Sequence, residues 1–178
     1  MSIINPRTPF RLIKWSFPPT GTLKLNTDGS KWSRGPNGFG GLIQYERGAW
    51  ICGYYGRMES CTSLETELWA VYKGLTIVLQ KGFTNVIVET DAQEVVKLLV
   101  EGPAEKHPYR GLVEDARIIF NGCQCTAQHV YREGNLCADA LAKLGAEQPE
   151  DILVVHEPPA EIRELLVADL LELGRERA

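Results

Sequence analysis

The sequence predicts an α/β protein built on a five-stranded mixed sheet, with three antiparallel strands, two parallel strands and flanking helices. Short alternating or β-branched stretches are interspersed with longer stretches in which apolar residues recur at helical spacing. Three strands come first and the later ones are separated by helices, an order typical of a mixed sheet. Strands are expected at residues 22–28, 39–46, 49–57, 84–91 and 123–132, and helices at 63–82, 92–102, 109–122 and 135–147.

The connections between these elements predict how the strands pair. Short turns join the first three strands, which favours an antiparallel meander. The helix 63–82 is the clearest element, with Ser63 suited to its N-cap and Gly82 to its C-terminal end. The strand 84–91 follows this long helix, so we expect it to cross over and pair in parallel with the first strand.

The two ends of the chain differ in pattern from the middle. Prolines interrupt residues 1–21, which we expect to form an arm, and the body is expected at 22–146. Residues 147–178 are predicted to be an acidic extension, in which DILVVHEPP is either a short strand or an extended segment. An amphipathic helix is expected after it, with an apolar stripe of Ile162, Leu165, Leu166, Leu170 and Leu173.

The formal net charge of −4 is unevenly distributed along the chain. Residues 147–178 carry nine acidic residues and three arginines, a net charge of −6, so the first 146 residues have a net charge of +2. If some acids of the body bind divalent cations, the remaining surface is basic. The balance therefore permits a nucleic-acid partner without demanding one.

Composition also bears on location. No run of about 18 apolar residues exists, so we expect no transmembrane helix and no membrane partner. The first 15 residues lack the apolar core of a signal peptide. The five cysteines form no CxxC pair, and Cys123 and Cys125 have the spacing of residues on one face of a strand. We expect reduced thiols in an intracellular protein, and the sequence does not distinguish nucleus, cytoplasm and organelles.

Four acidic residues stand where the predicted fold can bring them together. Asp28 ends the first strand and Asp91 ends the strand 84–91. If these strands are parallel neighbours, both carboxylates emerge at the C-terminal edge of the sheet, where open α/β sheets place ligands. Glu67 lies one turn into the long helix at the border of its buried stripe. Asp139 lies in the first turn of the last core helix.

Each of these residues also has a simpler explanation. Asp28 suits a turn, Asp91 suits a helix cap, and acids near helix N-termini are favoured by the helix dipole. A cluster of carboxylates, however, is repulsive and persists when hard cations such as Mg²⁺ or Mn²⁺ offset the repulsion. Two such ions about 4 Å apart can activate a water and stabilise the leaving oxygen in phosphodiester hydrolysis.

Four ordered motifs, LNTDGS, TELWAVYKGL, VIVETDAQEVV and HVYREGNLCADALAKL, closely resemble the ribonuclease H type 1 superfamily. More narrowly, they are similar to the plant ribonuclease H-like domain of retroelement-derived proteins, over residues 14–146. The resemblance implies a ribonuclease H-like fold and endonucleolytic hydrolysis of the RNA strand of RNA–DNA hybrids. It also implies a two-metal mechanism with two Mg²⁺ ions, for which Mn²⁺ can substitute. We expect a monomer whose partner is the hybrid.

The resemblance implies roles for individual residues. Four of them match the acidic residues that bind the metals and carry catalysis in the family. Glu65, two residues before one of these ligands, would point elsewhere on the helix. Three further positions resemble those that approach the hybrid backbone and minor groove, where the 2′-hydroxyl distinguishes RNA from DNA. The implied metal ligands are Asp28, Glu67, Asp91 and Asp139, and the implied substrate-binding residues are Gly29, Ser30 and Gln93.

One departure from the family concerns the segment before the last helix, where many members carry a histidine that assists turnover. His129 has the usual spacing to Asp139, yet the loop HVYREGN is short and His129 is expected to end its strand. Arg132 resembles the arginine that replaces the histidine in members with a short loop. We therefore prefer Arg132, which can steady phosphate charge but cannot shuttle protons near neutral pH, and keep His129 as the alternative.

A second departure is the absence of the basic protrusion that some bacterial members insert. The corresponding segment EGPAEKHPYRG offers only Lys106, His107 and Arg110, and phosphate contacts dominate affinity for nucleic acids. One alternative is therefore a nucleic-acid-binding module domesticated from a retroelement, with weak or absent catalysis.

Another alternative is an exonuclease on a similar fold. Such enzymes usually place an Asp-x-Glu pair on the first strand, whereas Asp28 is followed by glycine and serine, so the sequence argues against this alternative.

Overall fold

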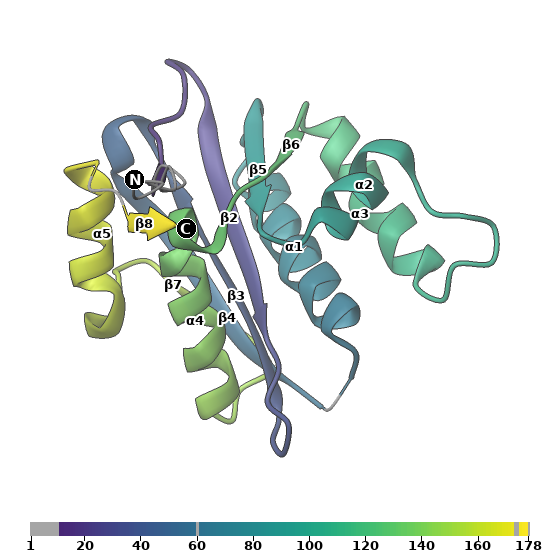
Figure 1. The fold of residues 1–178 in the computed structure, drawn as a ribbon. Coiled ribbons are helices and arrows are strands. Elements are labelled where there is room, and N and C mark those ends of the chain that lie inside the picture. The colour runs from purple at the N-terminus through teal and green to yellow at the C-terminus, as the bar shows by residue number, and fades with distance from the viewer. Residues whose placement is uncertain (1–10, 60, 173–174, 178) are drawn as a thin grey trace, which may run out of the picture.

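The computed structural model describes residues 11–59, 61–172 and 175–177, and its main sheet is mixed, with the order β6-β5-β2-β3-β4-β7 (Figure 1). The first three of these strands in the chain form the predicted antiparallel meander, and β5 pairs in parallel with both β2 and β6. The predicted α/β fold is confirmed, and β7 adds a sixth strand. The strands are β2 Leu23–Ser30, β3 Asn37–Gln44, β4 Trp50–Met58, β5 Val86–Thr90, β6 Thr126–His129 and β7 Leu153–Val155.

Helices cover both faces of the sheet (Figure 1). One face packs on α1, α2 and α3 through a large apolar cluster that includes Leu25, Ile43 and Tyr54. The other face packs on α4 and α5 through a smaller cluster around Leu42 and Leu141. No helix among the described residues is long and apolar enough to cross a membrane. The helices are α1 Ser63–Gln80, α2 Gln93–Glu101, α3 Arg110–Gly122, α4 Leu136–Glu147 and α5 Arg163–Leu170, with short 3-10 turns η1 Glu46–Gly48, η2 Arg132–Gly134 and η3 Ala160–Ile162.

The two ends of the chain meet in a small sheet of their own. β1 (Arg11–Ile13) pairs antiparallel with β8 (Arg175–Arg177). Within the extension, β7 decides the open alternative for DILVVHEPP in favour of a strand, which pairs with β4. Ile162 and Leu166 of the predicted stripe are buried, whereas Leu170 is 47% exposed. Residues 1–10 of the predicted arm and Leu173 lie outside the described residues, and the division into arm, body and extension stays a prediction.

Several predicted boundaries are wrong in instructive ways. β2 does not end at Asp28, because Gly29 and Ser30 continue its ladder with β3. The N-cap of α1 is Thr62 and not Ser63, since Thr62 Oγ1 accepts a hydrogen bond from the Glu65 backbone N–H at 3.1 Å. α1 ends at Gln80 with Lys81 as its C-cap, two residues before the predicted end, and Gly82 follows with a φ of 69°, which suits the glycine predicted to terminate the helix.

Another wrong boundary concerns the two neighbouring cysteines. Cys123 is the C-cap of α3, and Gln124 takes a φ of 53°, so β6 begins only at Thr126. Cys123 and Cys125 therefore precede the strand and do not share one of its faces. The five cysteines, all among the described residues, form no disulfide bond with one another.

Glycines on β3 allow α4 to lie unusually close to the sheet. A Cβ at Gly38 would stand 2.1 Å from the Ala142 carbonyl oxygen, and one at Gly40 would stand 2.7 Å from the Ala142 nitrogen. Real Cβ atoms do not approach backbone at such distances, and backbone cannot move aside as a flexible side chain can. The two glycines thus fix the height of α4 above β3, and with it the position of Asp139 in the first turn of α4.

We expect Gly40→Ala to destabilise the fold, because the added methyl group collides with the α4 backbone. Overpacking of this kind costs about 1–3 kcal/mol in the free energy of unfolding, measurable by urea denaturation. Gly111→Ala in α3 is the matched control: no atom lies within 4 Å of its added Cβ. There the higher helix propensity of alanine should leave stability unchanged or slightly raised. Equal stability of the two variants would contradict this account of α4 packing.

Candidate metal site

The register of the two central strands brings two carboxylates to the same level. The parallel ladder between β2 and β5 pairs Leu23 with Val86 and ends with Asn26 opposite Glu89. Asp28 and Asp91 each follow two residues after that last pair. Asp28 lies within β2 and Asp91 directly follows β5, so the aligned register brings both to the same edge of the sheet. The sequence prediction that parallel pairing brings these two residues to one edge is therefore confirmed.

Glu67 reaches this edge from α1 because β2 has no side chain in its way. Glu67 lies in the second turn of α1, and Thr62 caps the N-terminus of this helix. A Cβ on Gly29 would stand 3.2 Å from Glu67 Cδ and 3.0 Å from Thr66 Cγ2. Gly29 therefore gives Glu67 room beside β2, next to Asp28.

Asp28, Glu67 and Asp91 form an acidic cluster whose potential ligand atoms all lie within 4.8 Å of one another. Burial, followed by repulsion from the neighbouring carboxylates, raises the pKa of Asp28 to about 10. Burial and the charge of Asp91 raise the pKa of Glu67 to about 8, and burial raises the pKa of Asp91 as well. Three mutually repelling carboxyls in a buried setting are stabilised either by protons or by a cation.

The donor set of this cluster fits a hard divalent cation. All three residues offer carboxylate oxygens, which are the ligands that Mg²⁺ and Mn²⁺ prefer. Glu67 Oε2 is buried and has no hydrogen-bond partner among the described residues. A buried carboxylate oxygen without a donor is costly, and a bound cation would remove that cost.

Asp139 stands at the rim of the cluster. It is close enough for its charge to raise the pKa values of Asp28, Glu67 and Asp91, but it does not belong to the tight group of three. Its carboxylate faces two cations of the chain instead: Lys143 Nζ lies 2.9 Å from Oδ2, and an Arg132 nitrogen lies 3.9 Å from Oδ1. The structure thus brings three of the four predicted ligands together and holds the fourth nearby.

The remaining predicted site residues lie around the same edge. His129 ends β6, as expected, and its Nε2–H donates to the Asp91 carbonyl oxygen at 3.2 Å. The Arg132 side chain is 62% exposed. Gln93 begins α2 and lines two adjoining grooves with Asp91, one of about 310 Å³ and one of about 270 Å³. Gly29 and Ser30 are the last two residues of β2 and directly follow Asp28.

The sequence analysis missed a buried polar network behind the cluster. The Lys24 ammonium lies 3.1 Å from Glu89 Oε2, and both side chains are at most 5% exposed. Asn26 Nδ2 donates to Glu89 Oε1 at 3.2 Å and to Asn135 Oδ1 at 2.9 Å, and Gln128 Nε2 also donates to Glu89. A charged residue in the apolar strand VIVET was the signal that could have revealed this network, because an unpaired buried charge is not tolerated.

Comparisons with known proteins agree with this geometry. Residues 26–145 match the family described as reverse transcriptase-like. The chain is 36% identical over 146 residues to an Arabidopsis thaliana protein whose name is putative ribonuclease H protein. That match covers 80% of this chain but only 23% of the relative, so the chain spans about a quarter of that protein's length.

Solved structures of ribonucleases H share the fold. RNase H1 from Halobacterium salinarum superposes with a TM-score of 0.65 at 24% identity, covering 71% of this chain and 98% of that one. LC11-RNase H1 in complex with an RNA/DNA hybrid gives a TM-score of 0.64 at 20% identity, covering 70% and 96%. The matched motifs and the shared fold together show that this chain belongs to the reverse transcriptase-like family and contains a ribonuclease H-like domain.

Proposed function

We propose that this chain is a metal-dependent endoribonuclease that hydrolyses the RNA strand of RNA–DNA hybrids. The observation that carries the proposal is the convergence of Asp28, Glu67 and Asp91 within 4.8 Å at the open edge of the sheet. The hybrid bound to LC11-RNase H1 supports the choice of substrate, because that protein shares the fold. Fold alone would not be sufficient, since one fold serves many functions.

In this proposal Asp28, Glu67 and Asp91 hold one Mg²⁺ ion, and Asp139 with Asp28 holds a second. Such a pair of ions, which Mn²⁺ can replace, supplies an activated water and stabilises the departing 3′ oxygen. The carboxylates must be ionised to bind the ions, so binding releases the protons that burial holds on Asp28 and Glu67. The Lys143 ammonium lies 2.9 Å from the Asp139 carboxylate, so this ion pair must break before Asp139 can bind the second ion.

The surrounding residues bind and orient the substrate in this proposal. Gly29, Ser30 and Gln93 border the carboxylates and would contact the sugar–phosphate backbone. The exposed guanidinium of Arg132 would steady a phosphate beside Asp139. The His129 ring is hydrogen-bonded to the Asp91 carbonyl oxygen and so holds the Asp91 loop, the short connection between β5 and α2. Because His129 is engaged in this contact, Arg132 is the preferred assisting residue.

A second candidate is a nucleic-acid-binding module with weak or absent catalysis. The close contact between Lys143 and Asp139 favours it, because an ammonium neutralises the carboxylate that a second ion would need. The absence of a basic protrusion between α2 and α3 points the same way. A binding module would retain hybrid affinity in EDTA and would not cleave the hybrid with either metal.

We expect Glu67→Gln to reduce cleavage of a labelled RNA–DNA hybrid by more than about 100-fold in Mg²⁺ or Mn²⁺. Loss of an outer partner of a metal site costs about 10–100-fold, so loss of a ligand should cost more. Glu65→Gln is the matched control: two residues away, its side chain points to another side of α1. Single-stranded RNA and duplex DNA should remain intact. Cleavage by Glu67→Gln at the rate of Glu65→Gln would contradict the assigned site.

The raised pKa values predict how the stability of the metal-free protein depends on pH. Both folded-state values lie above the ordinary values of 3.8 for Asp28 and 4.5 for Glu67. Below about pH 4 both carboxyls are protonated in either state and cost nothing. Between about pH 4 and pH 8–10 the two carboxyls are ionised in the unfolded chain but protonated in the folded one. The folded state therefore binds more protons, and the free energy of unfolding falls as the pH rises.

Asp28→Asn should therefore raise the Tm of the EDTA-treated protein at pH 8, by roughly 2–8 °C for a chain of this size. Mg²⁺ should raise the Tm of the parent and have little effect on the variant. Asp115→Asn, at an exposed position of α3, is the control for the change in net charge. A variant that melts at or below the parent temperature at pH 8 would show that the cluster is not repulsive.

We expect Arg132→Ala to lower kcat on the hybrid by about tenfold, the value of one charge-assisted hydrogen bond. His129→Ala should change kcat less, while weakening the hold on the Asp91 loop and so raising the Mg²⁺ concentration needed for half-maximal rate. Steady-state kinetics across a Mg²⁺ series separates the two effects. If His129→Ala gave the larger loss of kcat at saturating Mg²⁺, the histidine would be the assisting residue.

A further inference from the structure

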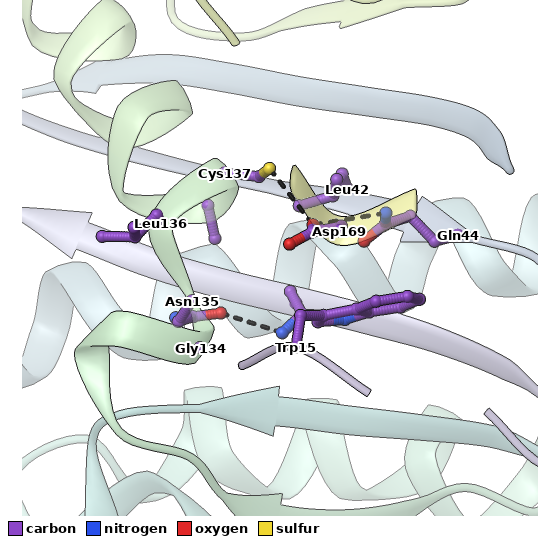
Figure 2. A pocket seen from close by; sticks show the side chains of 10 residues that line it. Trp15, Leu42, Gln44, Gly134, Asn135, Leu136, Cys137 and Asp169 are labelled. Atoms are coloured by element: carbon purple, nitrogen blue, oxygen red, sulfur yellow. Dashed lines mark hydrogen bonds between the residues drawn. The ribbon is translucent and has the colours of Figure 1, made fainter. Parts of the chain in front are cut away.

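Two segments outside the family-matched residues 26–145 converge on the start of α4. The arm passes over η2: a Cβ on Gly134 would stand 3.3 Å from the Lys14 carbonyl oxygen. The arm and the extension are also joined to each other through the pairing of β1 with β8. Figure 2 shows the place where they meet: Trp15 of the arm and Asp169 of the extension line one pocket together with Gly134, Asn135 and Cys137.

From the arm, a directed chain of hydrogen bonds runs to the metal cluster. The indole N–H of Trp15, which is 4% exposed, donates to Asn26 Oδ1 at 3.0 Å. This contact leaves Asn26 Nδ2 to donate to Asn135 Oδ1 at 2.9 Å. Asn135 Nδ2 then donates at 3.0 Å to the carbonyl oxygen of Thr27, the residue before Asp28. Each donor thus sets the orientation of the next amide.

Asn135 also connects this chain to the fourth carboxylate. It precedes α4, and its carbonyl oxygen accepts the backbone N–H of Asp139 at 3.1 Å. One residue therefore ties the backbone beside Asp28 to the backbone of Asp139. Through these two contacts Asn135 orients the start of α4 relative to β2, and with it the rim carboxylate relative to the tight cluster.

From the extension, Asp169 of α5 contacts Cys137 in the first turn of α4. Cys137 Sγ donates to Asp169 Oδ2 at 3.4 Å, and Gln44 Nε2 donates to the same oxygen at 3.5 Å (Figure 2). Ile162 and Leu166 of the extension pack beside Cys137 in the smaller apolar cluster. The pocket between these groups is too narrow to hold a water molecule. A lost contact here could not be replaced by water, so its neighbours would have to reorient.

We propose that the arm and the extension together clamp the first turn of α4, and that Trp15 is a positioning residue of the carboxylate site. The clamp holds Asp139 near Asp28, Glu67 and Asp91, so that the site binds its cation more tightly than the family-matched residues alone would allow. This inference rests on the proposed function for its consequence in catalysis, but the clamp itself can be tested without substrate.

The test compares Trp15→Phe with Trp50→Phe in the full chain. Phenylalanine keeps an aromatic ring but removes the indole donor and one fused ring, so the control must lose the same atoms. Trp50 is the matched control, because its Nε1–H also donates one hydrogen bond, to the His156 carbonyl oxygen at 3.0 Å. We expect Trp15→Phe to weaken Mg²⁺ binding, measured by calorimetric titration of the protein alone, by about tenfold, as for outer partners of metal sites. Trp50→Phe should bind like the parent.

Hydrogen exchange of the metal-free protein separates the clamp from the metal site. Trp15→Phe should speed exchange of the Asp139 amide, while amides in the middle of α1 exchange as in the parent. If Trp15→Phe speeds exchange of the Asp139 amide but the parent protein binds no Mg²⁺, the proposed function is refuted and the clamp is supported. Unchanged exchange together with unchanged Mg²⁺ affinity would overturn the clamp, even if the Tm fell. Should Trp15→Phe not fold, Asp169→Ala decides by the same two measurements and is expected to act in the same direction.

Discussion

The parallel pairing of β2 with β5 is the constraint on which the candidate site depends. Two of the three clustered carboxylates lie two residues beyond the last pair of this ladder, so the register alone determines that they meet. A slip of one residue would turn one of them to the opposite face. The buried pair of Lys24 and Glu89 bridges these same strands. A buried ion pair adds little net stability, and we infer that this one is kept because it specifies the register.

The site stores unfavourable energy that the rest of the fold must offset. Its carboxyls are buried among like charges, and Glu67 Oε2 lacks a donor among the described residues. Such groups lower stability in the absence of a cation and bind one more strongly when it is offered. The close packing of α4 on the glycines of β3 and the large apolar cluster against α1 supply a rigid frame for them. A looser frame would let the carboxylates separate and lose their affinity for metal.

The spacing of residues was sufficient to predict the fold class, the order of the elements and the edge at which the acids gather. Apolar periodicity separates helices from strands, and a long helix between two strands implies parallel pairing, which aligns Asp28 with Asp91. Which of several possible side-chain contacts forms within a helix could not be predicted. Thr62 caps α1 only because its hydroxyl meets the Glu65 amide, and Lys143 competes for Asp139 only because one helical turn brings them together.

The buried network escaped prediction for a different reason: its members are polar residues in strands and loops, where polar side chains usually face water. Lys24, Asn26 and Glu89 are buried because α4 and the arm cover that face of the sheet. Asn26 alone bridges the arm, β5 and α4. An apolar side chain there would remove the donor to Asn135 Oδ1 and leave the Asn135 amide oriented by its contact with the Thr27 carbonyl oxygen. Hydrogen bonds between amides are directional, so this network can set the orientation of α4 where apolar packing sets only its distance.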